Sequence, residues 1–121
     1  MEVNADPASG DWVICLCAEW CGVCRDWRAV FEQAAGQHPN ARFVWVDVED
    51  EAAAMGDVDV ETFPTLLVAA ASRPLFFGPV LPSAPGLQRL LSSVLGPGAA
   101  ATGITPDVAE LFRRLAATLP N

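Results

Sequence analysis

Three predominantly apolar runs stand out along the first two thirds of the chain, at residues 12–18, 42–48 and 65–71. They are rich in strand-forming residues and predict buried strands. Between the first two runs, apolar residues recur at the spacing of one helix face, and these are Val23, Trp27, Val30, Phe31 and Ala34. We therefore predict a strand, a helix that Gly36 and Pro39 stop, and a second strand parallel to the first.

The middle of the chain predicts a hairpin. Residues 49–61 are acidic and irregular, with one helical turn expected at 52–55. The strand at 65–71 is followed by a turn at 72–74 and a short strand at 75–77, which favours an antiparallel pair.

Two more helices are expected after the hairpin. Ser83 can cap the first of them, whose apolar stripe is Leu87, Leu90, Leu91, Val94 and Leu95. Residues 96–104 predict a linker. The last helix, at 105–119, has an apolar stripe of Val108, Leu111, Phe112, Leu115 and Leu119. The whole chain, 1–121, is thus expected to form a single α/β domain with a core at about 12–95 and a mixed sheet between helices.

Composition and charge exclude several classes of protein. Of the 121 residues, 52% are hydrophobic and 18% are charged, which is too apolar for a disordered chain. The net charge is -8, so no basic patch can follow a nucleic acid or an anionic membrane. No segment resembles an export signal or a transmembrane helix, and we expect a cytoplasmic protein. A periplasmic location is the alternative if a native leader was removed.

The four cysteines are bunched, which indicates a site rather than a scaffold: Cys15, Cys17, Cys21 and Cys24. Cys21 and Cys24 follow the first predicted strand, at a spacing that places both sulfurs on one face of the first helical turn. A helix N-terminus stabilises an anion, which favours the thiolate of Cys21. Cys24 can then attack a mixed disulfide formed at Cys21. A zinc site of four thiolates is the alternative, but Cys15 and Cys17 have no loop to wrap a metal, so we expect none.

The segment Ala18–Arg25, with the sequence AEWCGVCR, resembles the active-site segment of the thioredoxin family. A second signature, Thr62–Thr65, matches the family's proline-containing segment before the third core strand. A weaker match is Gly78, which falls where the family has a glycine that lines the substrate groove. The resemblance covers about residues 12–95. It implies a three-layer sandwich, in which a mixed sheet of about four strands has helices on both faces.

The resemblance also implies roles for individual residues. Cys21 and Cys24 are the catalytic pair, and their redox-active disulfide takes the place of any cofactor. The Phe63–Pro64 bond is expected to be cis and to face the dithiol. The substrate-binding residues are Trp20, Gly22, Val23, Phe63, Pro64 and Gly78.

The sequence departs from the family pattern at both ends. Only eleven residues precede Trp12, so the family's N-terminal strand–helix unit is expected to be shortened or absent. We hypothesise that the extra C-terminal helix, at 105–119, covers the sheet face that this unit leaves bare.

Other departures lie around the dithiol. Cys15 stands where relatives have a buried aspartate, Cys17 where they have an aromatic residue, and Val23 where they have proline. Buried free cysteines commonly act as small hydrophobic residues. The other hypothesis is that Cys15 exchanges with Cys24 to form a disulfide in place of Cys21–Cys24. We therefore regard Cys15, Cys17 and Glu19 as possible modulators, and Trp45 replaces a lysine that often lies near the aspartate.

The sequence as a whole predicts a thiol–disulfide oxidoreductase that reduces or exchanges protein disulfides and maintains cell redox homeostasis. We expect a monomer that acts on protein disulfides and is recharged by a reductase partner. Two alternatives remain open. One is an exported disulfide isomerase or oxidant of the same fold, and the other is a peptide-binding module of this fold without catalysis.

Overall fold

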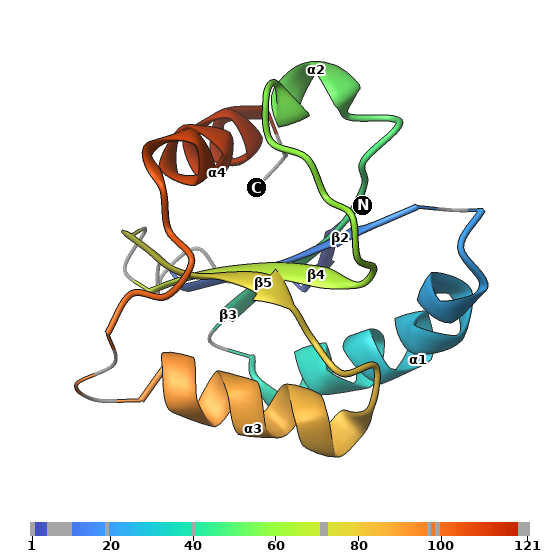
Figure 1. Cartoon of the computed structure of the whole chain (residues 1–121). Coiled ribbons are helices and arrows are strands. Elements are labelled where there is room, and N and C mark those ends of the chain that lie inside the picture. Colours follow the sequence, from blue (N-terminus) through green and yellow to red (C-terminus); the bar gives the residue numbers. More distant parts are fainter. Residues whose placement is uncertain are drawn as a thin grey trace.

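The computed structural model describes residues 2–4, 11–18, 20–39, 41–70, 73–96, 98 and 100–118. A twisted sheet lies in the middle of the molecule with helices on both faces (Figure 1). The strands are β1 (Glu2–Asn4), β2 (Asp11–Cys17), β3 (Ala41–Asp47), β4 (Thr65–Ala70) and β5 (Arg73–Pro79). The helices are α1 (Gly22–Gln37), α2 (Ala52–Met55), α3 (Ala84–Val94) and α4 (Pro106–Thr118).

The strand order in the sheet is β1-β3-β2-β4-β5, with β2 at the centre. Strand β2 runs parallel to β3 and antiparallel to β4, and β4 pairs with β5 as an antiparallel hairpin. These pairings confirm the predicted mixed sheet. The sheet has one strand more than expected, because β1 pairs antiparallel with β3 at the edge. At three residues, β1 is too short to show an alternating pattern in the sequence.

Strand β2 supplies side chains to two separate cores, because successive side chains of a strand point to opposite faces. Val13, Cys15 and Cys17 belong to one core together with residues of α1 and α3. Ile14 and Leu16 belong to the other, together with residues of α2 and α4. All five are at most 1% exposed, so β2 is buried on both faces, as its continuous apolar run predicts.

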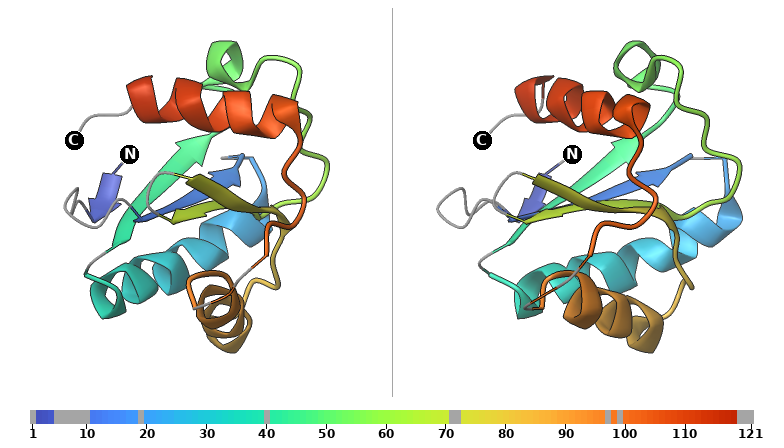
Figure 2. Two further views of the ribbon diagram at one scale, coloured as in Figure 1. Left: turned by 90° about the vertical axis from the view of Figure 1, so that its left-hand side faces the viewer. Right: turned by 60° about the vertical axis from the view of Figure 1, so that its left-hand side comes forward.

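Helix α1 covers the first face of the sheet beside α3 (Figure 2). Its buried residues are Cys24, Trp27, Phe31, Ala34 and Ala35. The helix continues through Gly36, contrary to the prediction, and ends at Gln37, with His38 as its C-cap just before Pro39. An exposed glycine lowers helix stability without ending the helix, whereas proline disfavours helical backbone in the residue before it.

Helix α4 covers the second face of the sheet, as hypothesised (Figure 2). Val108, Leu111, Phe112 and Leu115 of its predicted stripe are buried there; Leu119 lies outside the described residues. The Thr105 hydroxyl caps the helix by accepting from the backbone N–H of Val108 at 3.2 Å. Arg114 joins α4 to α2 because its Nε donates to the carbonyl of Ala54 at 2.6 Å.

The segment between α3 and α4 crosses the edge of the sheet to reach the second face. Thr102 pairs with β5 there: its N–H donates to the carbonyl of Leu75 at 2.8 Å, and its carbonyl accepts from Phe77 N–H at 3.0 Å. Gly103 follows with a φ of +74°, and a Cβ atom at this position would lie 2.1 Å from the carbonyl oxygen of Phe77. Only glycine therefore fits this crossing.

No helix in the described ranges is long and apolar enough to cross a membrane.

Candidate active site

Cys21 lies at the junction between β2 and α1, as the N-cap residue of the helix. Its backbone is extended, with φ -84° and ψ 118°, and its N–H donates to the carbonyl of Ala18 at 3.0 Å. Its side chain is a free thiol of intermediate exposure. The first turn of α1 contains no acidic residue, so no carboxylate of that turn offsets the partial positive charge of the helix N-terminus.

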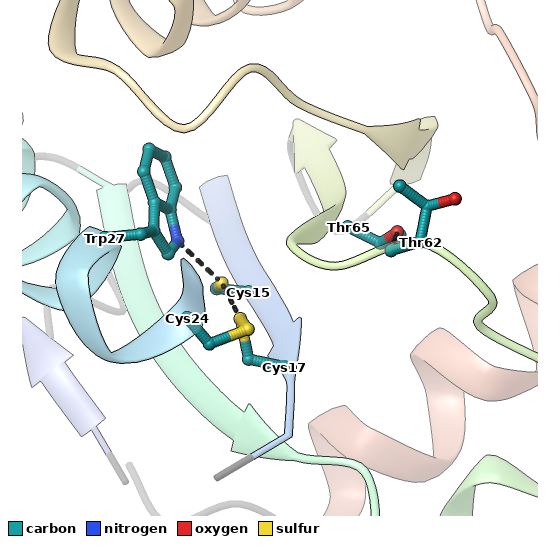
Figure 3. The surroundings of a disulfide bond; sticks show 6 residues. All are labelled: Cys15, Cys17, Cys24, Trp27, Thr62 and Thr65. Atoms are coloured by element: carbon teal, nitrogen blue, oxygen red, sulfur yellow. Dashed lines mark hydrogen bonds between the residues drawn. A yellow bond between two sulfur atoms is a disulfide. The ribbon is translucent and has the colours of Figure 1, made fainter. Parts of the chain in front are cut away.

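Cys24, in the first turn of α1, is bonded to Cys17 of β2 rather than to Cys21 (Figure 3). Both bonded cysteines are 1% exposed, and their Cα atoms lie 5.9 Å apart, within the usual range for disulfides. The expected Cys21–Cys24 disulfide is therefore not the one that this structure contains. The hypothesised second partner of Cys24 is also different, because it is Cys17 and not Cys15.

Cys21 and Cys24 differ in their surroundings. The spacing argument placed Cys21 and Cys24 on one face of the first helical turn, but α1 begins only at Gly22. Cys21 therefore has an extended backbone and precedes that turn. Cys24 points into the core under the sheet, where the inward-facing side chains of β2 include Cys17.

Cys15 lies next to the Cys17–Cys24 disulfide in the core. Its Sγ lies 3.7 Å from that of Cys17 and accepts a hydrogen bond from the indole Nε1–H of Trp27 at 3.2 Å. Burial raises the pKa of the Cys15 thiol to about 12, although the Trp27 hydrogen bond and the Arg28 charge act in the opposite direction. Cys15 is thus a neutral thiol at physiological pH. Its register partner on β3 is Trp45, and the Arg28 guanidinium lies over the Trp45 ring, 5.1 Å from the ring centroid.

The raised pKa of Cys15 predicts a loss of stability in alkali. In the folded protein the Cys15 thiol keeps its proton up to about pH 12, whereas in the unfolded chain it loses the proton near pH 9.0. The contribution of Cys15 to the free energy of unfolding is therefore fully present below pH 9 and is lost as the pH rises toward 12. Between pH 8 and pH 10, the free energy of unfolding of the wild type should fall by about 1.4 kcal/mol more than that of Cys15→Ala. Urea denaturation of both proteins under the same non-reducing conditions measures this difference. If the free energy of unfolding of both proteins falls equally between pH 8 and pH 10, the pKa of Cys15 is not raised in the folded protein.

Apolar side chains form a rim beside Cys21. Trp20 is 64% exposed and Val23 is 46% exposed. The Trp20 ring packs edge-to-face on that of Phe63 with centroids 5.7 Å apart, which brings the junction before α1 next to the loop before β4. Glu49, which the sequence did not single out, fixes the indole by accepting from its Nε1–H at 3.1 Å. No sequence pattern identifies this contact, because the partners are 29 residues apart.

Hydrogen bonds to Thr65 and Val80 hold the loop at residues 62–64 in place. The Phe63–Pro64 peptide bond is cis. The Thr65 hydroxyl donates to the carbonyl of Thr62 at 2.6 Å, and the Pro64 carbonyl accepts from Val80 N–H at 3.1 Å. Figure 3 shows the two threonine side chains at the start of β4. The loop therefore has a defined position next to Trp20.

The remaining predicted residues lie around this rim or outside it. Gly22 is exposed at the first position of α1, and Gly78 lies on β5 opposite Leu66 of β4. Glu19 lies outside the described residues. Within the described ranges, no group of three or more His, Cys, Asp or Glu side chains is arranged to hold a metal ion.

The amino-acid sequence of this chain is similar to those of known proteins. The family model for thioredoxin matches residues 2–76. The protein designated thioredoxin 2 in Streptomyces coelicolor is 34% identical over 68 residues, which cover 55% of this chain and 51% of that protein. Thioredoxin H2-1 of Oryza sativa subsp. japonica is 37% identical over 57 residues, which cover 47% of this chain and 41% of that protein. The chain thus spans about half the length of these curated relatives, or somewhat less.

A solved structure shows the same fold. A mutant thioredoxin from Halobacterium salinarum superposes with a TM-score of 0.62, over 81% of this chain and 80% of that one. The sequence identity is 22%, so this likeness concerns the fold alone.

Proposed function

Because the chain belongs to the thioredoxin family, we propose that it is a thiol–disulfide oxidoreductase that reduces disulfides in proteins. The observation that carries the proposal is the free, partly exposed thiol of Cys21 at the N-terminus of α1, three residues before a cysteine that already takes part in a disulfide. A nucleophilic thiol and a second sulfur close by are the two parts that disulfide exchange requires.

The reaction begins at Cys21. Its thiolate attacks one sulfur of a substrate disulfide, the substrate S–S bond breaks, and one substrate sulfur leaves as a thiolate. Cys24, once reduced, attacks the Cys21 sulfur of the mixed disulfide and releases the second substrate thiolate. The substrate gains two electrons, and the protein is left with a Cys21–Cys24 disulfide, which a reductase partner returns to the dithiol.

The apolar rim supports a substrate with an extended peptide segment. Trp20 and Val23 expose apolar surface beside the nucleophile, and Phe63 packs against the Trp20 ring. We assign substrate binding to these residues together with Gly22, Pro64 and Gly78. In the reducing cytoplasm, which remains the proposed compartment, the direction of the reaction is reduction of the substrate.

Reduction of insulin tests this function. With dithiothreitol as the electron source, the protein should accelerate the precipitation of reduced insulin chains beyond the rate with dithiothreitol alone. The matched control is the same protein after reduction and alkylation with iodoacetamide, which should not accelerate the reaction. Equal rates for the untreated and the alkylated protein would contradict the proposal.

A further inference from the structure

The reduction mechanism above uses Cys21 and Cys24 but gives no role to Cys17, although Cys17 is the residue bonded to Cys24 in this structure. We propose that Cys17 is a third redox-active residue, which takes the disulfide over from Cys21 and stores it in the core as Cys17–Cys24. This inference rests on the proposed function, because substrate reduction supplies the Cys21–Cys24 disulfide from which the transfer starts.

The arrangement of the three cysteines carries this proposal. Cys24 lies between two possible partners, because Cys21 precedes it at the helix N-cap and Cys17 faces it from β2. The Cys17 partner lies in the core and is 1% exposed, whereas Cys21 lies at the surface with intermediate exposure. The same sulfur of Cys24 can therefore be bonded to an accessible or to an inaccessible cysteine.

The transfer step is an internal disulfide exchange. The Cys17 sulfur, as a thiolate, attacks the Cys24 sulfur of the Cys21–Cys24 disulfide. The Cys17–Cys24 bond forms, the Cys21–Cys24 bond breaks, and the Cys21 sulfur leaves as a thiolate at the N-terminus of α1. Cys17 loses one proton when it ionises, and the released Cys21 thiolate takes up one proton, so the number of protons does not change. One disulfide is present before and after, so no external oxidant or reductant takes part.

Cys15 is placed to assist Cys17 in this exchange. Because Cys17 carries no proton in the disulfide, the S–H of Cys15 is the only one in the pair, and the two sulfurs lie 3.7 Å apart. The Trp27 indole N–H already donates to the Cys15 sulfur, which leaves the Cys15 S–H available to Cys17. A buried thiol that keeps its proton is a donor toward Cys17 when that sulfur becomes negative.

The stored disulfide changes what the oxidised protein can do. In a protein with only Cys21–Cys24, oxidation removes the nucleophile from use. After the transfer, Cys21 is again a free thiol while Cys24 is occupied by Cys17. Cys21 can then attack a second substrate disulfide, but no thiol of Cys24 is free to release it. The oxidised protein is therefore expected to retain a second substrate as a mixed disulfide until a reductant opens Cys17–Cys24.

Alkylation of the oxidised native protein tests this inference. The reduced protein is oxidised by one equivalent of insulin disulfide, sampled at intervals, labelled with iodoacetamide without unfolding, and mapped by mass spectrometry without reduction. In the wild type, Cys21–Cys24 should appear first and then give way to Cys17–Cys24, with label on Cys21. In Cys17→Ala, Cys21–Cys24 should persist, and labelling of Cys21 should be at least about tenfold slower than in the wild type.

Two further proteins act as controls. Cys15→Ala removes the hydrogen-bond donor to Cys17, and it should still form Cys17–Cys24 with label on Cys21, but more slowly than the wild type. Cys17→Ser keeps a side chain of nearly the same size, and it should behave like Cys17→Ala. The mapping of the wild type needs no variant, so it decides the outcome even if a substitution at this buried position prevents folding.

The inference fails if Cys21–Cys24 persists in the wild type with Cys21 unlabelled. It also fails if Cys21 is labelled in oxidised Cys17→Ala, because the disulfide from which the transfer starts is then not formed. Insulin reduction separates these outcomes from a failure of the proposed function. Active wild type with a persistent Cys21–Cys24 disulfide refutes the transfer alone, whereas inactive wild type refutes the function itself.

Discussion

Replacing Cys21 by serine should reduce the rate of insulin reduction by at least about a hundredfold, because a serine hydroxyl is not ionised at neutral pH and cannot replace a thiolate as nucleophile. Serine is nearly the same size as cysteine, and Cys21 is partly exposed at the helix N-cap, where serine is a favoured residue. The fold should therefore be retained. The measurement is the initial rate of insulin reduction, together with the circular dichroism spectrum of each protein.

The matched control for this prediction is Cys15→Ala. Cys15 belongs to the same cluster but is buried and stays protonated, so its replacement should leave most of the activity. If Cys21→Ser and Cys15→Ala reduce insulin at similar rates, Cys21 is not the nucleophile.

Shortening a buried side chain of α4 should have the largest effect on stability. Leu111 is fully buried against the second face of the sheet, so Leu111→Ala removes apolar contacts and leaves a cavity. We expect the free energy of unfolding to fall by about 3 kcal/mol. Urea denaturation monitored by tryptophan fluorescence measures this loss. Because α4 lies on the face of the sheet opposite to α1, the folded fraction of this variant should keep its activity (Figure 1).

Arg113→Ala provides the matched control on the same helix. The Arg113 side chain is 73% exposed and forms an ion pair with Glu110, a neighbour on the surface of α4. Its replacement should change the free energy of unfolding by less than about 0.5 kcal/mol. If Leu111→Ala and Arg113→Ala lower the free energy of unfolding by similar amounts, the burial of Leu111 against the sheet does not stabilise the fold.

Much of this fold can be predicted from local patterns. The strand at β2, the helix at α1 and the hairpin of β4 and β5 each produce a hydrophobic period or a continuous apolar run that the sequence displays directly. The stripe of α4 predicts an amphipathic helix, and the resemblance to the thioredoxin family indicates which face needs it. Strand β1 could not be predicted, because three residues are too few for a period and its pairing with β3 is a long-range contact.

The site was predictable in its residues but not in its bonding. The AEWCGVCR segment identifies Cys21 and Cys24, and the position of Cys21 before α1 follows from the strand-to-helix transition. The bonding of Cys24 to Cys17 depends on which face of β2 meets α1. Boundaries of elements are the least certain part of a sequence-based prediction. Cys17 was accordingly singled out only as a modulator and not as a partner.

The pairing of Thr102 with β5 has a consequence for self-association. An edge strand offers unpaired backbone N–H and C=O groups to strands of other molecules, and this is a common route to aggregation. Here the carbonyl of Leu75 and the N–H of Phe77 are already occupied by Thr102, and Gly103 allows the close approach that this pairing needs. The segment that carries the chain from one face of the sheet to the other therefore also blocks the middle of this edge strand against an incoming strand.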